Sequence, residues 1–274
     1  MRASRKRPHP RYGQHFLADG GVCRKILDAL GESGGTVVEI GPGRGALTRP
    51  LLARGVRVVA FEIDAALAAA LRREFAGAPL SVLTADALEV DVAEALADAG
   101  VSPPVPLVGN LPYDSATPIL RAFVRKPGLF SRLVVMIQKE VADRLLARPR
   151  TPEYGYLTLD VGAHAAARRL FDVKPGAFLP PPGVMSTVVE LTPHPPAPDA
   201  VRSLAVASAG FTLRRKTLVN ALTPLCGREN AAAAVAALGL LPTVRAEELT
   251  LAEFAALSLR LDPARNAKTK PEES

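Results

Sequence analysis

Apolar, β-rich segments alternate with helix-forming segments along the first half of the chain, and this alternation restricts the fold more than any other feature. Strands are expected at residues 36–40, 56–61, 80–84, 105–109 and 133–138. Apolar residues recur at helical spacing in residues 19–30, 46–54, 65–75 and 139–147. Because parallel strands need a crossover connection, usually a helix, the pattern predicts an α/β fold with a mostly parallel, doubly wound, Rossmann-like sheet.

The second half of the chain shows a different pattern. A Val-rich strand is expected at residues 184–191, and the proline-rich segment 192–198 is the clearest linker. Only helical signals follow, at residues 201–211, 218–222, 229–238 and 251–259. We therefore expect an α/β domain at residues 1–194 and a small, all-helical C-terminal domain at residues 195–274, with a disordered tail from Asn266.

The charge distribution favours a polyanionic partner. Lys and Arg number 34 against 27 Asp and Glu, which gives a net charge of +7. Basic residues crowd an N-terminal arm at residues 1–11, and the cluster Arg214-Arg215-Lys216 falls on an expected helix. Such clusters bind nucleic acids through phosphates, although a solvated arm in a generally basic protein is the alternative.

Several classes of protein are not expected from this composition. The two cysteines, Cys23 and Cys226, show no CxxC spacing, and the four histidines form no metal-ligand pattern. No apolar run reaches the roughly twenty residues of a membrane span, and no apolar segment follows the basic N-terminus as in a secretory signal. We therefore expect a cytoplasmic protein without a disulfide scaffold, metal site or membrane segment.

A glycine-rich segment, residues 39–45 (Glu-Ile-Gly-Pro-Gly-Arg-Gly), follows one expected strand and begins a helix. Glycines there let the backbone approach a ligand closely. Glu62 ends the next strand, where a carboxylate can accept both hydroxyls of a ribose, and Asp86 ends the third, where it can accept an adenine amine. Gly41 and Gly43 also fit a dinucleotide pattern, so both a nicotinamide cofactor and S-adenosylmethionine remain open, as does a tight turn with solvated acids.

The tetrapeptide Asn110-Leu111-Pro112-Tyr113 follows the fourth expected strand and favours S-adenosylmethionine. The Asn110 amide and the Leu111 carbonyl can accept the two hydrogens of a ring amine, Pro112 can hold carbonyls outward, and Tyr113 offers a stacking face. Methyl transfer to an aromatic amine uses these groups, whereas hydride transfer does not. An Asn helix cap followed by a core Tyr is the structural alternative.

Six motifs, in this order, resemble those of the ribosomal RNA adenine N6-dimethyltransferases. They are residues 12–17 (Tyr-Gly-Gln-His-Phe-Leu), 39–43 (Glu-Ile-Gly-Pro-Gly), 86–88 (Asp-Ala-Leu), 110–113, 138–141 (Gln-Lys-Glu-Val) and 178–182 (Phe-Leu-Pro-Pro-Pro). Tyr113 and the Arg-Arg-Lys helix favour the small-subunit (16S) rRNA branch over the large-subunit branch. The resemblance implies a Rossmann-like S-adenosylmethionine-dependent methyltransferase sheet followed by a helical rRNA-binding domain.

The resemblance also implies roles for the cofactor-binding residues. His15 and Leu17 would contact the methionine part of S-adenosylmethionine, and Gly41 and Gly43 would allow the close backbone approach. The remaining cofactor contacts would come from Glu62 to the ribose, Asp86 to the adenine, and Asn110.

The target adenine would be held by Asn110, Leu111, Pro112 and Tyr113, with Phe178 stacking on its other face. Phe178 is otherwise an ordinary core residue. A base held between two rings must be unpaired or flipped out.

The implied reaction is dimethylation of N6 on two adjacent adenines near the 3′ end of small-subunit rRNA. The expected partner is the immature small ribosomal subunit, and the protein is expected to act as a monomer. Two alternatives stay open: a ribosome-assembly or RNA-binding factor with dispensable catalysis, and an N6-adenine methyltransferase for another nucleic acid. The chain departs from the family pattern at Arg44, Ser115 and Gly183, where the last replaces a lysine that can contact phosphate.

Overall fold

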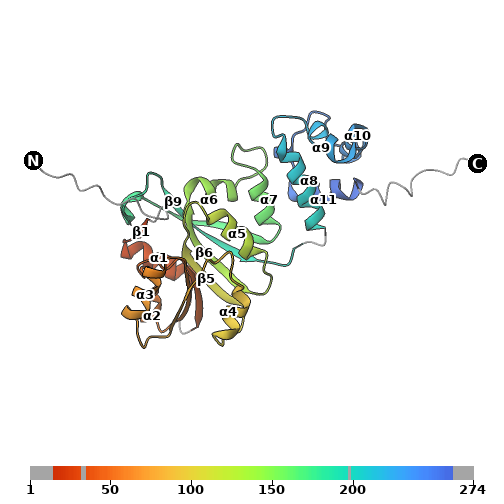
Figure 1. Cartoon of the computed structure of the whole chain (residues 1–274). Helices are drawn as coiled ribbons and strands as arrows, with labels where there is room; N and C mark the ends of the chain where they lie inside the picture. Colours follow the sequence, from red (N-terminus) through yellow and green to blue (C-terminus); the bar gives the residue numbers. More distant parts are fainter. Residues whose placement is uncertain (1–14, 32–34, 197–198, 262–274) are drawn as a thin grey trace, which may run out of the picture. The chain divides into compact units, whose positions relative to one another are not determined.

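The computed structural model describes residues 15–31, 35–196 and 199–261, and these residues form two compact units (Figure 1). Unit 1 comprises the chain as far as Ala142 together with Ala167–Pro193. Unit 2 comprises Asp143–Ala166 together with the chain from His194 onward. The predicted basic arm and the predicted disordered tail lie outside the described residues.

The strands and helices of unit 1 alternate along most of its length. In chain order its elements are β1 (Phe16–Leu17), α1 (Gly20–Leu30), β2 (Thr36–Ile40), α2 (Thr48–Ala53), β3 (Arg57–Glu62), α3 (Ala65–Glu74), β4 (Leu80–Thr84), α4 (Val92–Asp98), β5 (Val105–Asn110), α5 (Ala116–Val124), β6 (Phe130–Gln138), a 3-10 turn η1 (Pro175–Ala177), β8 (Phe178–Leu179) and β9 (Ser186–Pro193). Helix α6 (Lys139–Leu145) and strand β7 (Ala165–Val173) each cross from one unit to the other.

A seven-stranded sheet with the order β4-β3-β2-β5-β6-β9-β7 forms the centre of unit 1. The pairs β2–β3, β2–β5, β3–β4 and β5–β6 are parallel, and β9 pairs antiparallel with β6. Figure 1 shows α1, α2 and α3 on one side of the sheet, and α4 and α5 on the other. The predicted doubly wound α/β sheet is confirmed.

The central strands are apolar along most of their length because helices cover both of their faces. Val37 and Val38 in β2, and Leu107 and Val108 in β5, are 0% exposed. Several helices of unit 1 begin at an aspartate whose carboxylate accepts from backbone N–H groups of the first turn. Asp19, Asp64 and Asp91 cap α1, α3 and α4 in this way, which fixes where each helix begins relative to the preceding strand.

A separate two-stranded sheet joins distant parts of unit 1. Strand β1 pairs antiparallel with β8, with Phe16 opposite Leu179 and Leu17 opposite Phe178. The N–H groups of Ala18 and Asp19 also donate to the carbonyl of Ala177. The chain before α1 is therefore fastened to the segment that precedes β9.

Unit 2 is mainly helical. Its elements include α7 (Tyr156–Gly162), α8 (Ala200–Thr212), α9 (Leu218–Cys226), α10 (Arg228–Ala236), a 3-10 turn η2 (Ala246–Glu248) and α11 (Leu251–Arg260). Phe254 and Leu257 of α11 lie in its core, which also takes in Leu159 and Ala163 of the α7 region. The buried hydroxyl of Tyr154 donates to the carbonyl of Leu249 at 2.7 Å.

The two units differ from the predicted division of the chain into residues 1–194 and 195–274. Unit 1 ends at Pro193, within the proline-rich segment 192–198, and residues 143–166 group with the C-terminal helices. They were assigned to the first domain because they precede the linker. The sequence pattern did not show that their apolar side chains pack into the second core.

The basic cluster Arg214-Arg215-Lys216 does not lie on a helix. Helix α8 ends at Thr212, and the cluster forms the exposed turn before α9. The Arg214 guanidinium donates to Glu247 at 2.8 Å and to the carbonyl of Pro152 at 2.5 Å. Elements α4, α5, α7, β1, β7 and β8 were also not anticipated, mostly because they are short or lack a strong apolar period.

Candidate active site

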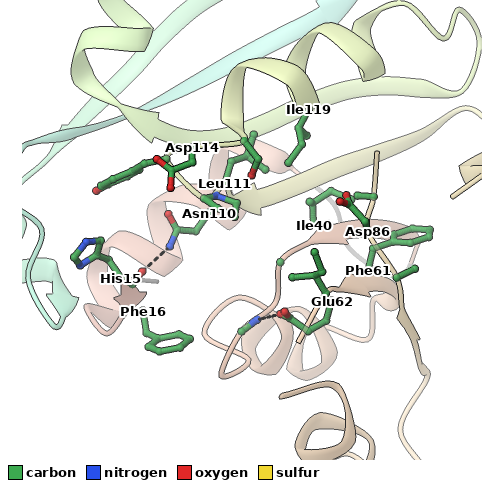
Figure 2. Close-up of a pocket in the computed structure, with 18 residues that line it drawn as sticks. His15, Phe16, Ile40, Phe61, Glu62, Asp86, Asn110, Leu111, Asp114 and Ile119 are labelled. Carbon is green, nitrogen blue, oxygen red and sulfur yellow. Dashed lines mark hydrogen bonds between the residues drawn. The ribbon is translucent and has the colours of Figure 1, made fainter. Parts of the chain in front are cut away.

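A pocket of about 420 Å³ opens in unit 1 at the carboxyl ends of β2, β3, β4 and β5 (Figure 2). The chain runs from β2 to β3 and β4 on one side and returns to β5 on the other. Open α/β sheets bind their ligands where the strand order reverses in this way. Nine of the predicted site residues line the pocket: His15, Gly41, Gly43, Glu62, Asp86, Asn110, Leu111, Pro112 and Tyr113.

The glycine turn after β2 forms the floor between the two halves of the pocket. Gly41 has φ +63° and its N–H donates to the carbonyl of Phe61 at 2.9 Å. Gly43 has φ +57°, and a Cβ atom there would lie 3.1 Å from the ring of Phe16. Both backbone conformation and space therefore favour glycine, and the bare backbone leaves room for a ligand.

Glu62 is held rigidly at the end of β3. Its carboxylate accepts from the N–H of Gly43 at 2.9 Å and from the N–H of Asp64 at 3.0 Å, and the residue is only 3% exposed. Burial raises the pKa of the Glu62 carboxyl above its usual value, while these two N–H bonds act in the opposite direction. A fixed carboxylate with remaining acceptor capacity suits the paired hydroxyls of a ribose.

Asp86 stands one strand further along, after β4. Its Oδ1 accepts from the N–H of Leu88 at 2.9 Å. Ile63, which follows Glu62, also lines the pocket and is 46% exposed, so the two acids flank an apolar surface. A purine between Glu62 and Asp86 would rest on this surface. Ile63 was not among the predicted site residues, although its place directly after the acidic end of β3 is a usable signal.

The Asn110 side chain is oriented by a backbone group that lies 95 residues earlier in the sequence. Its Nδ2 donates to the carbonyl of His15 at 3.0 Å (Figure 2). Only the NH2 group of an amide can donate to a carbonyl, so the bond fixes which end of the amide is which. The Oδ1 atom is therefore the acceptor end of the amide, on a residue that lines the pocket.

Tyr113 and His15 form the wall beside Asn110. Their ring centroids lie 5.6 Å apart at an interplanar angle of 32°. The Tyr113 hydroxyl bonds to Ser186 Oγ at 2.9 Å, and His15 Nδ1 donates to the carbonyl of Pro180 at 2.8 Å. Burial raises the pKa of Tyr113, so the ring stays neutral and offers an uncharged stacking face.

Two predicted residues, Leu17 and Phe178, are not among those that line this pocket. They are 6% and 3% exposed and belong to the hydrophobic core. Because they lie opposite each other in the β1–β8 pair, both turn to the same side. Phe178 is therefore a core residue in this structure and does not face the pocket to stack on a base. Leu17 borders a smaller adjoining cavity of about 30 Å³.

Glu39 lies beneath the glycine turn and also borders the smaller cavity. It is 1% exposed, and its carboxyl accepts from the Thr48 hydroxyl at 2.7 Å. Burial raises the pKa of Glu39 to about 7, although the bond from Thr48 opposes the shift. Between about pH 4.5 and pH 7 the folded chain keeps a proton there that the unfolded chain has lost, so this group's contribution to stability falls as pH rises through that range.

The lining of the pocket fits S-adenosylmethionine. Carboxylates stand at the ends of two adjacent strands for the nucleoside, the glycine turn exposes its backbone in the middle, and the Asn110 half accepts hydrogen bonds. Within the described ranges, no group of three or more His, Cys, Asp or Glu side chains could hold a metal ion. Likewise, no helix among those residues is both long enough and apolar enough to cross a membrane.

Comparison with known proteins gives consistent matches along the chain. Residues 5–262 match a family model described as ribosomal RNA adenine dimethylase. A protein of Methylococcus capsulatus named ribosomal RNA small subunit methyltransferase A is 42% identical over 261 residues, covering 93% of this chain and 98% of its own length. The protein of that name from Rhodospirillum rubrum is 45% identical over 259 residues, covering 92% and 87%.

Solved structures agree with these matches. The 23S rRNA methyltransferase ErmE has a TM-score of 0.66 at 26% identity, covering 90% of this chain and 99% of its own. A dimethyladenosine transferase from Plasmodium falciparum has a TM-score of 0.70 at 24% identity, covering 93% and 98%, and shares the fold.

Proposed function

The chain belongs to the ribosomal RNA adenine dimethylase family, and we propose that it dimethylates N6 of two adjacent adenines near the 3′ end of small-subunit (16S) rRNA. It is an S-adenosylmethionine-dependent methyltransferase. The relatives named for the small ribosomal subunit confirm the branch expected from the sequence. The immature small subunit in the cytoplasm, where bacterial ribosomes assemble, is the proposed partner, and a monomer is proposed as the active form.

One observation carries the chemical part of this proposal: the orientation of the Asn110 amide. Its donor end is occupied by the His15 carbonyl at 3.0 Å, which supports a role of the acceptor end toward a base in the pocket. An exocyclic amine is a weak nucleophile because its lone pair is delocalised into the purine. Oδ1 of Asn110 and the carbonyl of Leu111 would accept its two hydrogens and draw the nitrogen toward tetrahedral geometry.

Bound S-adenosylmethionine supplies an electrophilic methyl group on a sulfonium. Glu62 and Asp86 would hold its nucleoside at the β3 and β4 strand ends, and the turn at Gly41 and Gly43 would allow its close approach. Positioning of the two reactants then provides most of the rate enhancement, with reacting atoms about 3–3.5 Å apart. No strong base is needed, since the alkylated amine is acidic and loses its proton readily.

The second methyl transfer places a further demand on the pocket. After the first transfer, N6 carries one hydrogen and one methyl group, so one of the two acceptors, Asn110 Oδ1 or the Leu111 carbonyl, faces a methyl group. For the second transfer, the methylated amine must therefore take a different position relative to the two acceptors. Tyr113, which stacks on the ring and makes no hydrogen bond to the amine, can hold the base in both orientations.

The test combines methylation and binding. Incubation of immature small subunits with methyl-labelled S-adenosylmethionine should place label on adenine N6, and a nucleoside digest should contain dimethyladenosine. Asn110→Ala should abolish the label while cofactor binding survives. Asn230→Ala is the matched control, because Asn230 also donates from its amide to a backbone carbonyl, at 2.9 Å, but on the exposed surface of unit 2.

Other outcomes would favour the alternatives. Label on DNA adenine in preference to the ribosomal subunit would reject the substrate. If Asn110→Ala binds subunits and fully restores their assembly in cells, the protein acts chiefly as an assembly factor. Label on guanine would contradict the proposed role of the Asn110 pocket.

A further inference from the structure

A third carboxylate, that of Asp114, lines the pocket and is not used in the scheme above. Asp114 follows Tyr113 in the turn between β5 and α5, and its side chain is exposed. The described part of the chain gives this carboxylate no hydrogen bond or ion pair. It does not serve as a helix cap either, since α5 has Ser115 as its N-cap and no side-chain capping bond.

The sheet order places Asp114 at the opposite end of the pocket from the other two acids. Asp86 and Glu62 follow β4 and β3, whereas Asp114 follows β5, which lies two strands beyond β3. With neighbouring strands about 4.8 Å apart, the β3 and β5 strand ends are separated by roughly 10 Å. Figure 2 shows Asp114 on the Asn110 side of the pocket, with Glu62 and Asp86 on the other side.

No Lys or Arg side chain among the described lining residues neutralises the charge of Asp114, so a cationic ligand is the candidate partner. The described residues that line the pocket include three carboxylates, those of Glu62, Asp86 and Asp114, and neither Lys nor Arg. A carboxylate near the entry of a polyanionic RNA repels the phosphates, so it opposes substrate binding. The methyl donor would bring a positive charge to the Asn110 side, on the sulfonium that carries the methyl group. The ammonium of its methionine part is present in the product as well, so only the sulfonium charge differs between the two.

We propose that Asp114 is a specificity residue that favours the cationic methyl donor over its neutral product. This inference rests on the S-adenosylmethionine dependence in the proposed function. During transfer the methyl C–S bond breaks and its electron pair stays on sulfur, while N6 gains the methyl group and releases a proton to water. The sulfur is then an uncharged thioether, and the Coulomb attraction to Asp114 is lost. Donor is retained and product is released.

The experiment measures ligand affinities without RNA. Isothermal titration gives Kd for S-adenosylmethionine, for S-adenosylhomocysteine and for sinefungin, which carries an ammonium group in place of the sulfonium methyl. Asp114→Asn keeps the shape and removes the charge. It should weaken the two cationic ligands roughly threefold to tenfold and change S-adenosylhomocysteine less than about twofold. Because the site is exposed, the discrimination of the native protein should shrink at high salt.

Two further variants make the result interpretable. Asp98→Asn removes an exposed carboxylate from α4, outside the pocket, and should change none of the three affinities. Asp114→Glu keeps the charge and should retain most of the discrimination.

The inference is overturned if Asp114→Asn changes all three ligands equally or not at all. If the three ligand affinities are unchanged and a separate titration with rRNA shows an altered affinity, Asp114 acts on a neighbouring nucleotide instead, which also overturns the inference. If the native protein binds none of the three ligands, the proposed function itself fails, which is a distinguishable result.

Discussion

Asn110→Asp is the sharpest test of how the amide is oriented. The substitution exchanges the NH2 group for an oxygen and keeps the second oxygen, so the acceptor toward a target amine is still available. The Nδ2 bond to the His15 carbonyl, 3.0 Å long in the structure, is lost. In its place two oxygens, one of them charged, would face each other at the same distance.

The size of the effect follows from that contact. Leaving the partly buried His15 carbonyl without a donor costs about 1–3 kcal/mol, and the repulsion between the two facing oxygens adds about 1 kcal/mol. An aspartate held in the orientation of the native Asn110 amide is therefore destabilised by about 2–4 kcal/mol. The carboxylate escapes the repulsion only by rotating, which withdraws Oδ1 from the target. At about 1.4 kcal/mol per factor of ten, kcat should fall roughly 30-fold to 1,000-fold.

Single-turnover methylation of immature small subunits measures the rate, and titration with S-adenosylmethionine measures cofactor affinity. The rate should fall while cofactor affinity is not weakened, since the cradle at Glu62 and Asp86 is untouched. Asn230→Asp is the matched control, because it removes a 2.9 Å bond from an amide to the Cys226 carbonyl on the exposed surface of unit 2. It should leave both quantities unchanged.

A variant that methylates within about threefold of the native rate would refute the reasoning. It would mean that the His15 carbonyl does not orient residue 110 during the reaction. Loss of cofactor affinity in parallel with the rate would place the effect on the cofactor half of the pocket instead.

Other substitutions test separate parts of the structure. Gly43→Ala should destabilise the protein by roughly 1 kcal/mol more than Gly77→Ala in urea unfolding, because both glycines have positive φ but only Gly43 packs against a ring. Equal effects would contradict that contact. The native protein should lose stability as pH rises from about 4.5 to about 7, because Glu39 must then ionise while buried, and Glu39→Gln should not. The free energy of unfolding of the variant should therefore rise by about 3 kcal/mol relative to the native protein over this range. Tm at pH 5 and at pH 8 measures the difference. A constant difference would show that Glu39 ionises normally. Tyr154→Phe removes the 2.7 Å bond to the Leu249 carbonyl and should cost about 1–3 kcal/mol of stability without changing cofactor affinity. A stability within 0.5 kcal/mol of native would indicate that another donor replaces the hydroxyl.

Most of the cofactor cradle was predictable from the sequence because of how parallel strands are arranged. Gly41, Glu62, Asp86 and Asn110 each stand at or just after the end of an apolar strand. Parallel strands end at the same edge of their sheet, so residues spread over seventy positions are brought to one pocket by topology alone. Ile63 was not predicted because its apolar side chain has no chemical signature and only its position directly after Glu62 marks it.

Contacts between distant segments were decided only by the tertiary structure. Phe178 has an aromatic ring that could stack on a base, but it pairs with Leu17 between β1 and β8, and its side chain lies in the hydrophobic core. The direction of the Asn110 amide depends on a carbonyl 95 residues away. Residues 143–166 join the second unit through partners such as Leu249. The sequence therefore determined the strand ends and the residue types they carry, since these follow from local pattern and strand direction. The side to which each ring and amide turns was decided by partners that local pattern does not specify.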